Sequence, residues 1–117
     1  MENYWLNDPE EHDFPAAQDY LELVYELEIV KQKVDLLKAA PTIMKKAKDI
    51  LRASMLPMLP NTNIHVKMNI RKAKKGKKLS PVLLVRGNEK LIIADGYHRI
   101  CAIYFLSEDL NVPCRLV

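Results

Sequence analysis

Five consecutive residues, Asp95-Gly96-Tyr97-His98-Arg99, combine side chains suited to binding and processing phosphate groups. They follow an apolar run and precede a segment with helical spacing, so the sequence places them where a strand becomes a helix. The first N–H groups of a helix have no partners within it and carry the positive end of its dipole. A glycine lets an anion approach these groups, and an arginine can hold phosphate oxygens through two N–H groups. We therefore predict a phosphate or nucleotide site formed by Gly96, Tyr97, His98 and Arg99.

Asp95 has two candidate roles at this junction. Its carboxylate can cap the helix, or it can hold the Mg²⁺ that accompanies a nucleotide such as ATP, ADP or CTP. In the second case Asp95 and His98 are the candidate catalytic residues of a phosphotransferase or nucleotide hydrolase, because phosphoryl transfer depends mainly on positioning and electrostatics. Such chemistry calls for a second carboxylate, and the sequence offers three candidates, Glu89, Glu108 and Asp49. In the purely structural alternative, Asp95 only caps the helix while His98 and Arg99 face solvent.

Zinc and disulfide chemistry are not expected. His98, Cys101 and Cys114 would supply only three zinc ligands, and no pair has Cys-x-x-Cys spacing. Two cysteines cannot form a disulfide framework, so we expect reduced thiols. The acidic N-terminus lacks the apolar core of a signal peptide, and no apolar run approaches the roughly 18–20 residues of a membrane span. The sequence thus predicts a cytoplasmic protein with no membrane partner.

The segments around the motif predict an α+β fold. Residues 81–85 and 91–94 are short apolar runs separated by a turn sequence, which is the pattern of a hairpin. Residues 97–107 have helical spacing, and residues 112–117 resemble a final strand. Residues 64–75 fit a short basic helix by one spacing and a strand by another, so both interpretations stay open.

The first half of the chain is predicted to be mostly helical. Residues 1–14 form an acidic lead-in that we expect to be loosely ordered, with Trp5 and Phe14 anchoring it to the domain. Residues 15–54 form a helical extension, with Pro41 separating its two helical stretches. The first stretch is either continuous or broken near residues 25–26. All 117 residues are expected to form a single domain.

An apolar stripe runs along the first helical stretch and raises the question of a homodimer. Its members recur at spacings of three and four residues: Tyr20, Leu23, Leu27, Val30, Val34 and Leu37. The stripe is shorter than the three to four heptads that favour a coiled coil. We therefore expect it to pack on the protein's own core, with a homodimer seam across residues 20–37 as the alternative.

Charge is divided unevenly along the chain. Residues 1–36 contain ten acids and two bases, whereas residues 37–117 contain sixteen bases and five acids. Such a basic half suggests an anionic ligand or attraction between the two halves. An alternative function follows, a nucleic-acid-binding or regulatory module that contacts the phosphate backbone. Its candidate residues are Lys45, Lys46, Arg71, Lys72, Lys74, Lys75, Lys77 and Lys78. The lack of a recognition-helix pattern in this stretch favours the nucleotide hypothesis.

Residues 64–117 resemble the core of the ParB/sulfiredoxin superfamily. The resemblance is carried by the run PVLLV, a turn, KLIIADGYHRICAIYFL and the final VPCRLV. It implies a small mixed β-sheet with packed helices and a nucleotide-phosphate site where the glycine motif opens a helix. The preceding helical extension, and the DGYHR form of the motif, are similar to those of an uncharacterised bacterial branch.

The motif can be compared with three activities of that superfamily. Partition proteins carry Gly-Glu-Arg-Arg, matched here at Gly96 and Arg99 only, so the resemblance does not extend to the glutamate used in CTP hydrolysis. Sulfiredoxins carry Gly-Gly-Cys-His-Arg, and Tyr97 stands where their catalytic cysteine lies. A phenol cannot supply thiolate chemistry, so we expect no sulfiredoxin activity. Free-serine kinases carry Asp-Gly-His-His-Arg, which differs from this motif only at Tyr97.

Overall fold

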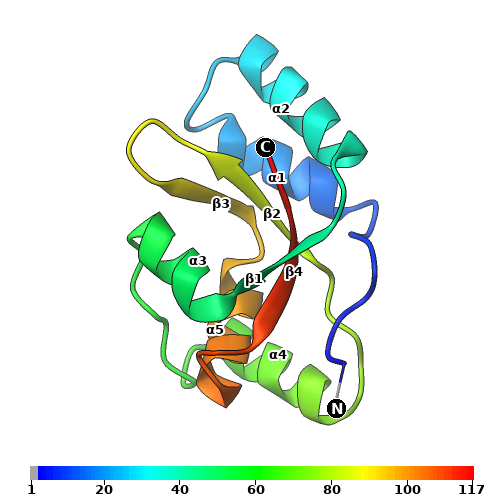
Figure 1. Cartoon of the computed structure of the whole chain (residues 1–117), viewed down its shortest axis with the longest axis vertical. Helices are drawn as coiled ribbons and strands as arrows, with labels where there is room; N and C mark the ends of the chain where they lie inside the picture. Colours follow the sequence, from blue (N-terminus) through cyan, green and yellow to red (C-terminus); the bar gives the residue numbers. More distant parts are fainter. Residues whose placement is uncertain (1–2) are drawn as a thin grey trace.

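A four-stranded mixed sheet organises the part of the chain that the computed structural model describes, residues 3–117 (Figure 1). The strands are β1 (Ile43–Lys46), β2 (Val82–Arg86), β3 (Leu91–Asp95) and β4 (Asn111–Leu116). They lie in the order β1-β4-β2-β3, with β4 parallel to β2 and the two outer pairs antiparallel. The predicted α+β class with a small mixed sheet is confirmed.

Helices cover both faces of the sheet. On one face lie α1 (Asp13–Leu21) and α2 (Leu27–Ala39), and on the other lie α3 (Ala47–Ser54), α4 (Ile64–Lys74) and α5 (Tyr97–Leu106). Strand β2 lies inside the sheet, and its residues from Val82 to Val85 are all buried. Val82 and Leu84 pack with α3, α4 and α5, whereas the alternate residues pack with α1 and α2. This burial on both faces explains why the segment is a continuous apolar run rather than an alternating one.

The helical prediction for residues 15–54 is wrong at residues 43–46. These residues form edge strand β1, which pairs antiparallel with β4 and places Ile43 opposite Cys114. Strand β4 would otherwise present an unpaired edge, and this long-range pairing overrides the local helical pattern. The break near residues 25–26, which the sequence left open, is present, because α1 ends at Leu21 and α2 begins at Leu27.

The break also divides the apolar stripe. Val30, Val34 and Leu37 are buried against the sheet, as predicted for packing on the protein's own core. Tyr20, Leu23 and Leu27, the other members of the stripe, are exposed around the turn between α1 and α2.

The acidic lead-in is ordered from residue 3 onward, so the prediction of loose order is wrong. Trp5 is 5% exposed and forms a bridge with Leu79. The backbone N–H of Leu79 donates to the Tyr4 carbonyl, and the N–H of Leu6 donates back to the Leu79 carbonyl. Phe14 is also buried, so the predicted anchoring by both aromatic residues is confirmed.

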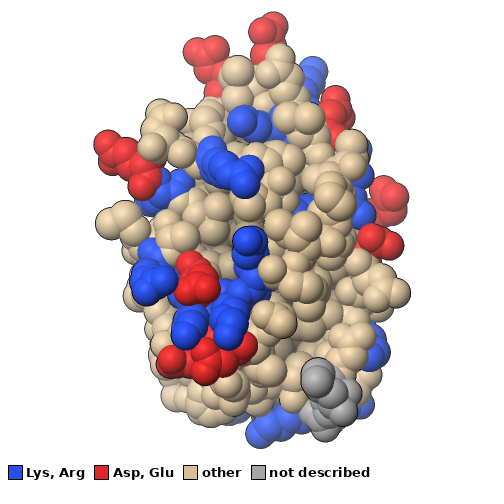
Figure 2. All heavy atoms as spheres, in the orientation of Figure 1, with Lys and Arg blue, Asp and Glu red and all other residues tan. Residues whose placement is uncertain are grey.

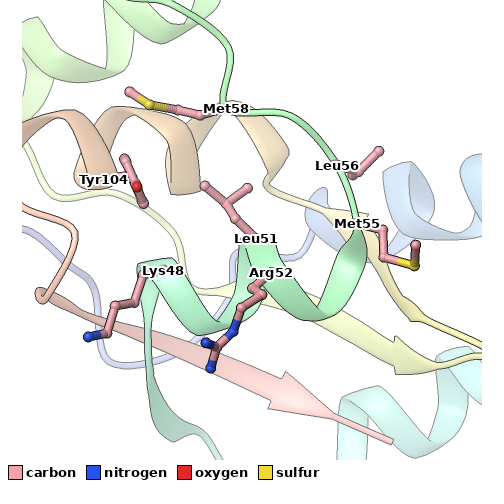
Figure 3. A pocket seen from close by; sticks show the side chains of 7 residues that line it. All are labelled: Lys48, Leu51, Arg52, Met55, Leu56, Met58 and Tyr104. Carbon is pink, nitrogen blue, oxygen red and sulfur yellow. The ribbon is translucent and has the colours of Figure 1, made fainter.

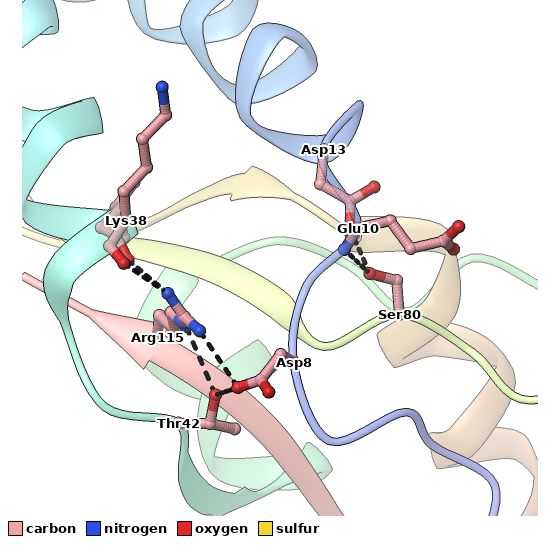
Figure 4. Close-up of polar contacts among 8 residues, drawn as sticks. Asp8, Glu10, Asp13, Lys38, Thr42, Ser80 and Arg115 are labelled. Carbon is pink, nitrogen blue, oxygen red and sulfur yellow. Dashed lines mark hydrogen bonds and ion pairs between the residues drawn. The ribbon is translucent and has the colours of Figure 1, made fainter.

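Arg115 fastens the same lead-in to the other end of the sequence (Figure 4). Its guanidinium donates to Asp8 at 3.1 Å and to the carbonyls of Leu37 and Lys38. Through Arg115 the acidic lead-in is thus attached to strand β4, as the uneven charge distribution of the sequence suggests.

The ambiguous segment at residues 64–74 is helix α4. The side chain of Asn63 caps it by accepting the N–H groups of His65 and Val66. A good N-cap at this position favours the helix over the alternating strand pattern. Within residues 3–117, no helix has both the length and the apolar character needed to cross a membrane.

Candidate functional site

The junction between β3 and α5 has the predicted strand-to-helix geometry. Strand β3 ends at Asp95, and Gly96 is the N-cap of α5 with φ 111° and ψ 14°. A side chain here would be strained, because this backbone conformation strongly favours glycine. It would also collide with β2, since a Cβ on Gly96 would lie 2.4 Å from Cγ1 of Val82.

Asp95 and Arg99 form an ion pair across the first turn of α5. Arg99 Nη2 lies 2.9 Å from Asp95 Oδ2, and the two side chains are 17% and 16% exposed. The same nitrogen donates to the Pro81 carbonyl at 3.4 Å. Within residues 3–117, the buried Nε of Arg99 has no hydrogen-bond partner. Burial raises the pKa of Asp95, and the nearby Arg99 opposes that shift.

Asp95 does not cap the helix, contrary to one predicted role. The N-cap is Gly96, and no side chain among residues 3–117 caps α5. The first N–H groups of α5 therefore have no side-chain hydrogen-bond partner among residues 3–117, as predicted from the sequence. The carboxylate of Asp95 is directed to Arg99 instead.

Tyr97 and His98 make contacts that the sequence does not reveal. The hydroxyl of Tyr97 donates to the carbonyl of Pro57, which ties α5 to the irregular connector after α3. The ring of His98 lies 4.9 Å from that of His65 on α4 and 5.8 Å from that of Tyr97. Burial, followed by the effects of His65 and Arg99, lowers the pKa of His98.

Arg99 reaches into a small polar hollow between α4, α5 and the acidic lead-in. The hollow has a volume of about 110 Å³. Three cationic side chains from separate segments line it: Lys72 on α4, Lys78 after α4, and Arg99 on α5. His12 and Asn69 add further polar groups. Gly96, Tyr97 and His98 do not line this hollow, so among the predicted phosphate ligands only Arg99 belongs to it.

The acidic lead-in contributes two carboxylates to the border of the same hollow, those of Glu10 and Asp13. Asp13 is buried and accepts hydrogen bonds from the Ser80 hydroxyl and from the Glu10 N–H, the latter at 3.2 Å (Figure 4). Ser80 is buried too, and its oxygen also accepts the Glu10 N–H. His12 Nε2 lies 3.4 Å from the other oxygen of Asp13.

None of the predicted second carboxylates lines the hollow around Arg99. Glu89 lies in the turn between β2 and β3, Asp49 pairs with Arg52 at 3.2 Å, and Glu108 lies near Tyr104. Asp13 does line the hollow, and its negative charge contributes, after burial, to the raised pKa of Asp95. Sequence reasoning missed it because Asp13 and Ser80 are 67 residues apart. The only local signal was a serine directly before the apolar run of β2.

The basic stretch of the sequence is divided in space. Lys45 and Lys46 lie on edge strand β1, whereas residues 71–78 lie at the end of α4 and beyond, at the far lower side of Figure 1. Figure 2 shows acidic atoms interspersed among the basic ones on this face. Lys48, for example, pairs with Asp109 at 3.0 Å. The predicted nucleic-acid residues are therefore divided between β1 and the region of α4.

A larger hollow of about 370 Å³ lies beside α3 (Figure 3). Its lining combines apolar side chains, among them Leu51, Met55 and Met58, with the cations Lys48 and Arg52. Its two cations are both paired, Lys48 with Asp109 and Arg52 with Asp49. The hollow beside Arg99 is the better candidate for an anion site, because two of its cations, Lys72 and Lys78, form no ion pair with residues 3–117.

The chain was compared with protein-family models, with curated proteins and with solved structures, and none of the three comparisons found a match. The ParB/sulfiredoxin-like assignment made from the sequence therefore stays a prediction.

Proposed function

We propose that this protein binds a phosphorylated small molecule, with a nucleotide as the favoured ligand, at the hollow beside Arg99. The observation that carries the proposal is the convergence of Lys72, Lys78 and Arg99 on one small polar hollow. Arginine and lysine side chains from separate elements form charge-assisted hydrogen bonds to phosphate oxygens. The volume, about 110 Å³, is on the scale of a phosphate group rather than of a whole nucleotide.

The three cations around the hollow are matched in number by the carboxylates of Glu10, Asp13 and Asp95, so the support for an anion comes from N–H donors that are not engaged in ion pairs. Arg99 is paired with Asp95, and Asp13 is engaged by Ser80 and by backbone N–H groups. Lys72 has no ion-pair partner among residues 3–117. Lys78 donates to the carbonyl of Asn3, which leaves two further N–H donors on its ammonium group. The two lysines therefore supply charged N–H donors that form no ion pair with any carboxylate of residues 3–117.

The rest of a nucleotide would extend along the start of α5. His98 directly precedes Arg99, and His65 lies one turn before Asn69 on α4. The ring of His98 lies close to those of His65 and Tyr97, and the two histidines are near Arg99 and Asn69 of the hollow in the sequence of their helices. Nucleobases stack on such rings, so these side chains favour a nucleotide over inorganic phosphate.

A phosphotransferase or nucleotide hydrolase is the more specific form of the proposal. Asp95 is the catalytic candidate, and its raised pKa suits a group that exchanges a proton. Ligand phosphate would have to displace Asp95 from Arg99 before that carboxylate could act. Within residues 3–117, no cluster of three or more His, Cys, Asp or Glu side chains could hold a metal ion.

Titration of the protein with ATP, ADP, CTP and inorganic phosphate, each with and without Mg²⁺, tests the proposal by calorimetry. Lys72→Gln removes a charge from the hollow, and Lys67→Gln removes one from exposed α4 outside it. We expect the first variant to bind about 10-fold more weakly or worse, since a hydrogen bond to a charged group contributes about 1.5–3 kcal/mol. The second variant should bind like the wild type.

Equal affinities of these two variants would contradict the proposed site. Nucleic acid is the competing ligand, and a labelled oligonucleotide measures it directly. Backbone binding through many lysines would fall steeply with salt and would respond equally to both substitutions.

A further inference from the structure

The turn between α1 and α2 presents an apolar surface surrounded by carboxylates. Leu23 is 83% exposed there, and three other large apolar side chains are exposed beside it: Tyr20, Val24 and Leu27. Every charged residue from position 14 to position 30 is acidic. The exposed ones are Asp19, Glu22, Glu26 and Glu28. We call these eight residues the acidic end.

A hollow of about 770 Å³ adjoins the acidic end. It lies between the α1–α2 turn and the β2–β3 turn, and Val24, Tyr25, Met55 and Ile92 contribute its apolar lining. An exposed apolar surface next to a hollow of this kind is typical of an interaction site. Side chains from another protein can insert into it.

The outer face of α4 has the opposite charge. Val66, Ile70 and Ala73 are the buried side of this helix. On the opposite side, Ile64 and Met68 are 67% and 49% exposed. Three exposed cations surround them, Lys67, Arg71 and Lys75, and α4 contains no acidic residue. We call these five residues the basic face.

These two surfaces lie toward opposite ends of the molecule. Figure 1 has the longest axis vertical, with α2 and the turn that precedes it in the upper half and α4 at the bottom. Each surface combines exposed apolar side chains with charges of a single sign, and the two signs are opposite. We infer that a second copy of this chain is the partner, and that the basic face of one copy docks on the acidic end of the next.

This contact is heterologous, so every open assembly has one free acidic end and one free basic face at its two termini. Repetition then builds a chain or ring of copies rather than a closed pair. A two-fold pairing through the exposed part of the 20–37 stripe is disfavoured. It would bring Asp19, Glu22 and Glu26 of one copy close to the same carboxylates of the other, and like charges repel.

Sedimentation velocity and light scattering at increasing protein concentration test this inference. We expect the average mass to rise above the monomer value of 13.5 kDa with concentration. The rise should weaken at high salt, because salt screens the attraction between exposed charges. A wild-type protein that stays at the monomer mass up to millimolar concentration would overturn the inference.

Two blocking variants identify the surfaces. Leu23→Lys places a cation in the acidic end, and Met68→Glu places a carboxylate in the basic face. Both side chains are substantially exposed, so circular dichroism should show an intact fold. Each variant alone should remain monomeric. A mixture of the two should form one-to-one pairs and nothing larger, because each variant retains the surface that the other has lost.

Leu36→Lys is the matched control, since Leu36 is an exposed leucine of α2 outside the acidic end. It should assemble like the wild type. A two-fold dimer would respond differently: Leu23→Lys would abolish it, Met68→Glu would leave it unchanged, and the mixture would form no pairs between the variants. That pattern would refute head-to-tail assembly.

Discussion

Arg99 Nη2 lies 2.9 Å from Asp95 Oδ2, and this ion pair joins the last residue of β3 to the first turn of α5. Both side chains are more than four-fifths buried. The pair therefore has a structural role besides the phosphate binding proposed for Arg99, because it holds Arg99 at the edge of the polar hollow.

Breaking this pair should destabilise the fold. Asp95→Ala leaves a largely buried guanidinium without its partner, and Arg99→Ala leaves a largely buried carboxylate. We expect each to lower the free energy of unfolding by about 1.5–3 kcal/mol. The double variant should lose clearly less than the sum, since neither charge is then left alone. Urea unfolding measures all three, and Asp49→Ala, which breaks a mostly exposed pair with Arg52, should have a much smaller effect.

Gly96→Ala should be more harmful than Gly76→Ala. Both glycines have positive φ, 111° and 77°, so both substitutions cost about 1–2 kcal/mol of backbone strain. Only at Gly96 does the new methyl group meet another side chain, that of Val82. This overpacking adds about 1–3 kcal/mol. Thermal unfolding checks the difference, and equal losses at the two positions would show that the contact with Val82 is unimportant.

Cys101 and Cys114 should both resist thiol reagents in the folded protein. Both are fully buried. Burial raises the pKa of Cys114 to about 11, and burial raises that of Cys101 despite a hydrogen bond from the Leu59 N–H. The thiolate is the reactive form, so alkylation by iodoacetamide should be very slow at neutral pH and fast in urea. Rapid labelling of either cysteine under native conditions would contradict the structure.

The lowered pKa of His98 predicts a loss of stability in mild acid. The unfolded chain takes up a proton on this histidine near its ordinary pKa of 6.5, whereas the folded protein does so at lower pH. The unfolded state therefore binds more protons between these values. Stability should fall as the pH drops below 6.5 and should level off below the folded pKa. Urea unfolding across this range measures the fall.

His98→Gln should remove that part of the pH dependence, and His65→Asn should move the pKa of His98 back toward its ordinary value. Ring-proton NMR reports the pKa of His98 directly. A value of 6.5 or above in the wild-type protein would show that burial and the neighbouring His65 and Arg99 do not act as described.

The sequence by itself determined the elements whose signals are local. The apolar runs of β2 and β3, the helical spacing of α5 and the glycine between them all predict the strand-to-helix junction correctly. Gly96 is informative because glycine is the only residue type that avoids both the backbone strain and the collision with Val82 at this position. The sequence left open whether the helical stripe is continuous or broken near residues 25–26, and the structure has the break.

Only the tertiary structure decided which distant residues meet. Strand β1 forms because the free edge of β4 needs hydrogen-bond partners, and no pattern within residues 43–46 reports that edge. The polar hollow joins Asp13, Ser80 and Arg99, which belong to three separate segments. Their contacts depend on how the acidic lead-in packs beside the start of β2, where Ser80 lies. Local periodicity carries no information on such long-range contacts. The sequence therefore pointed to Arg99, and separately to Lys72 and Lys78 as part of a basic stretch, but not to their meeting with Asp13 and Ser80 at one hollow.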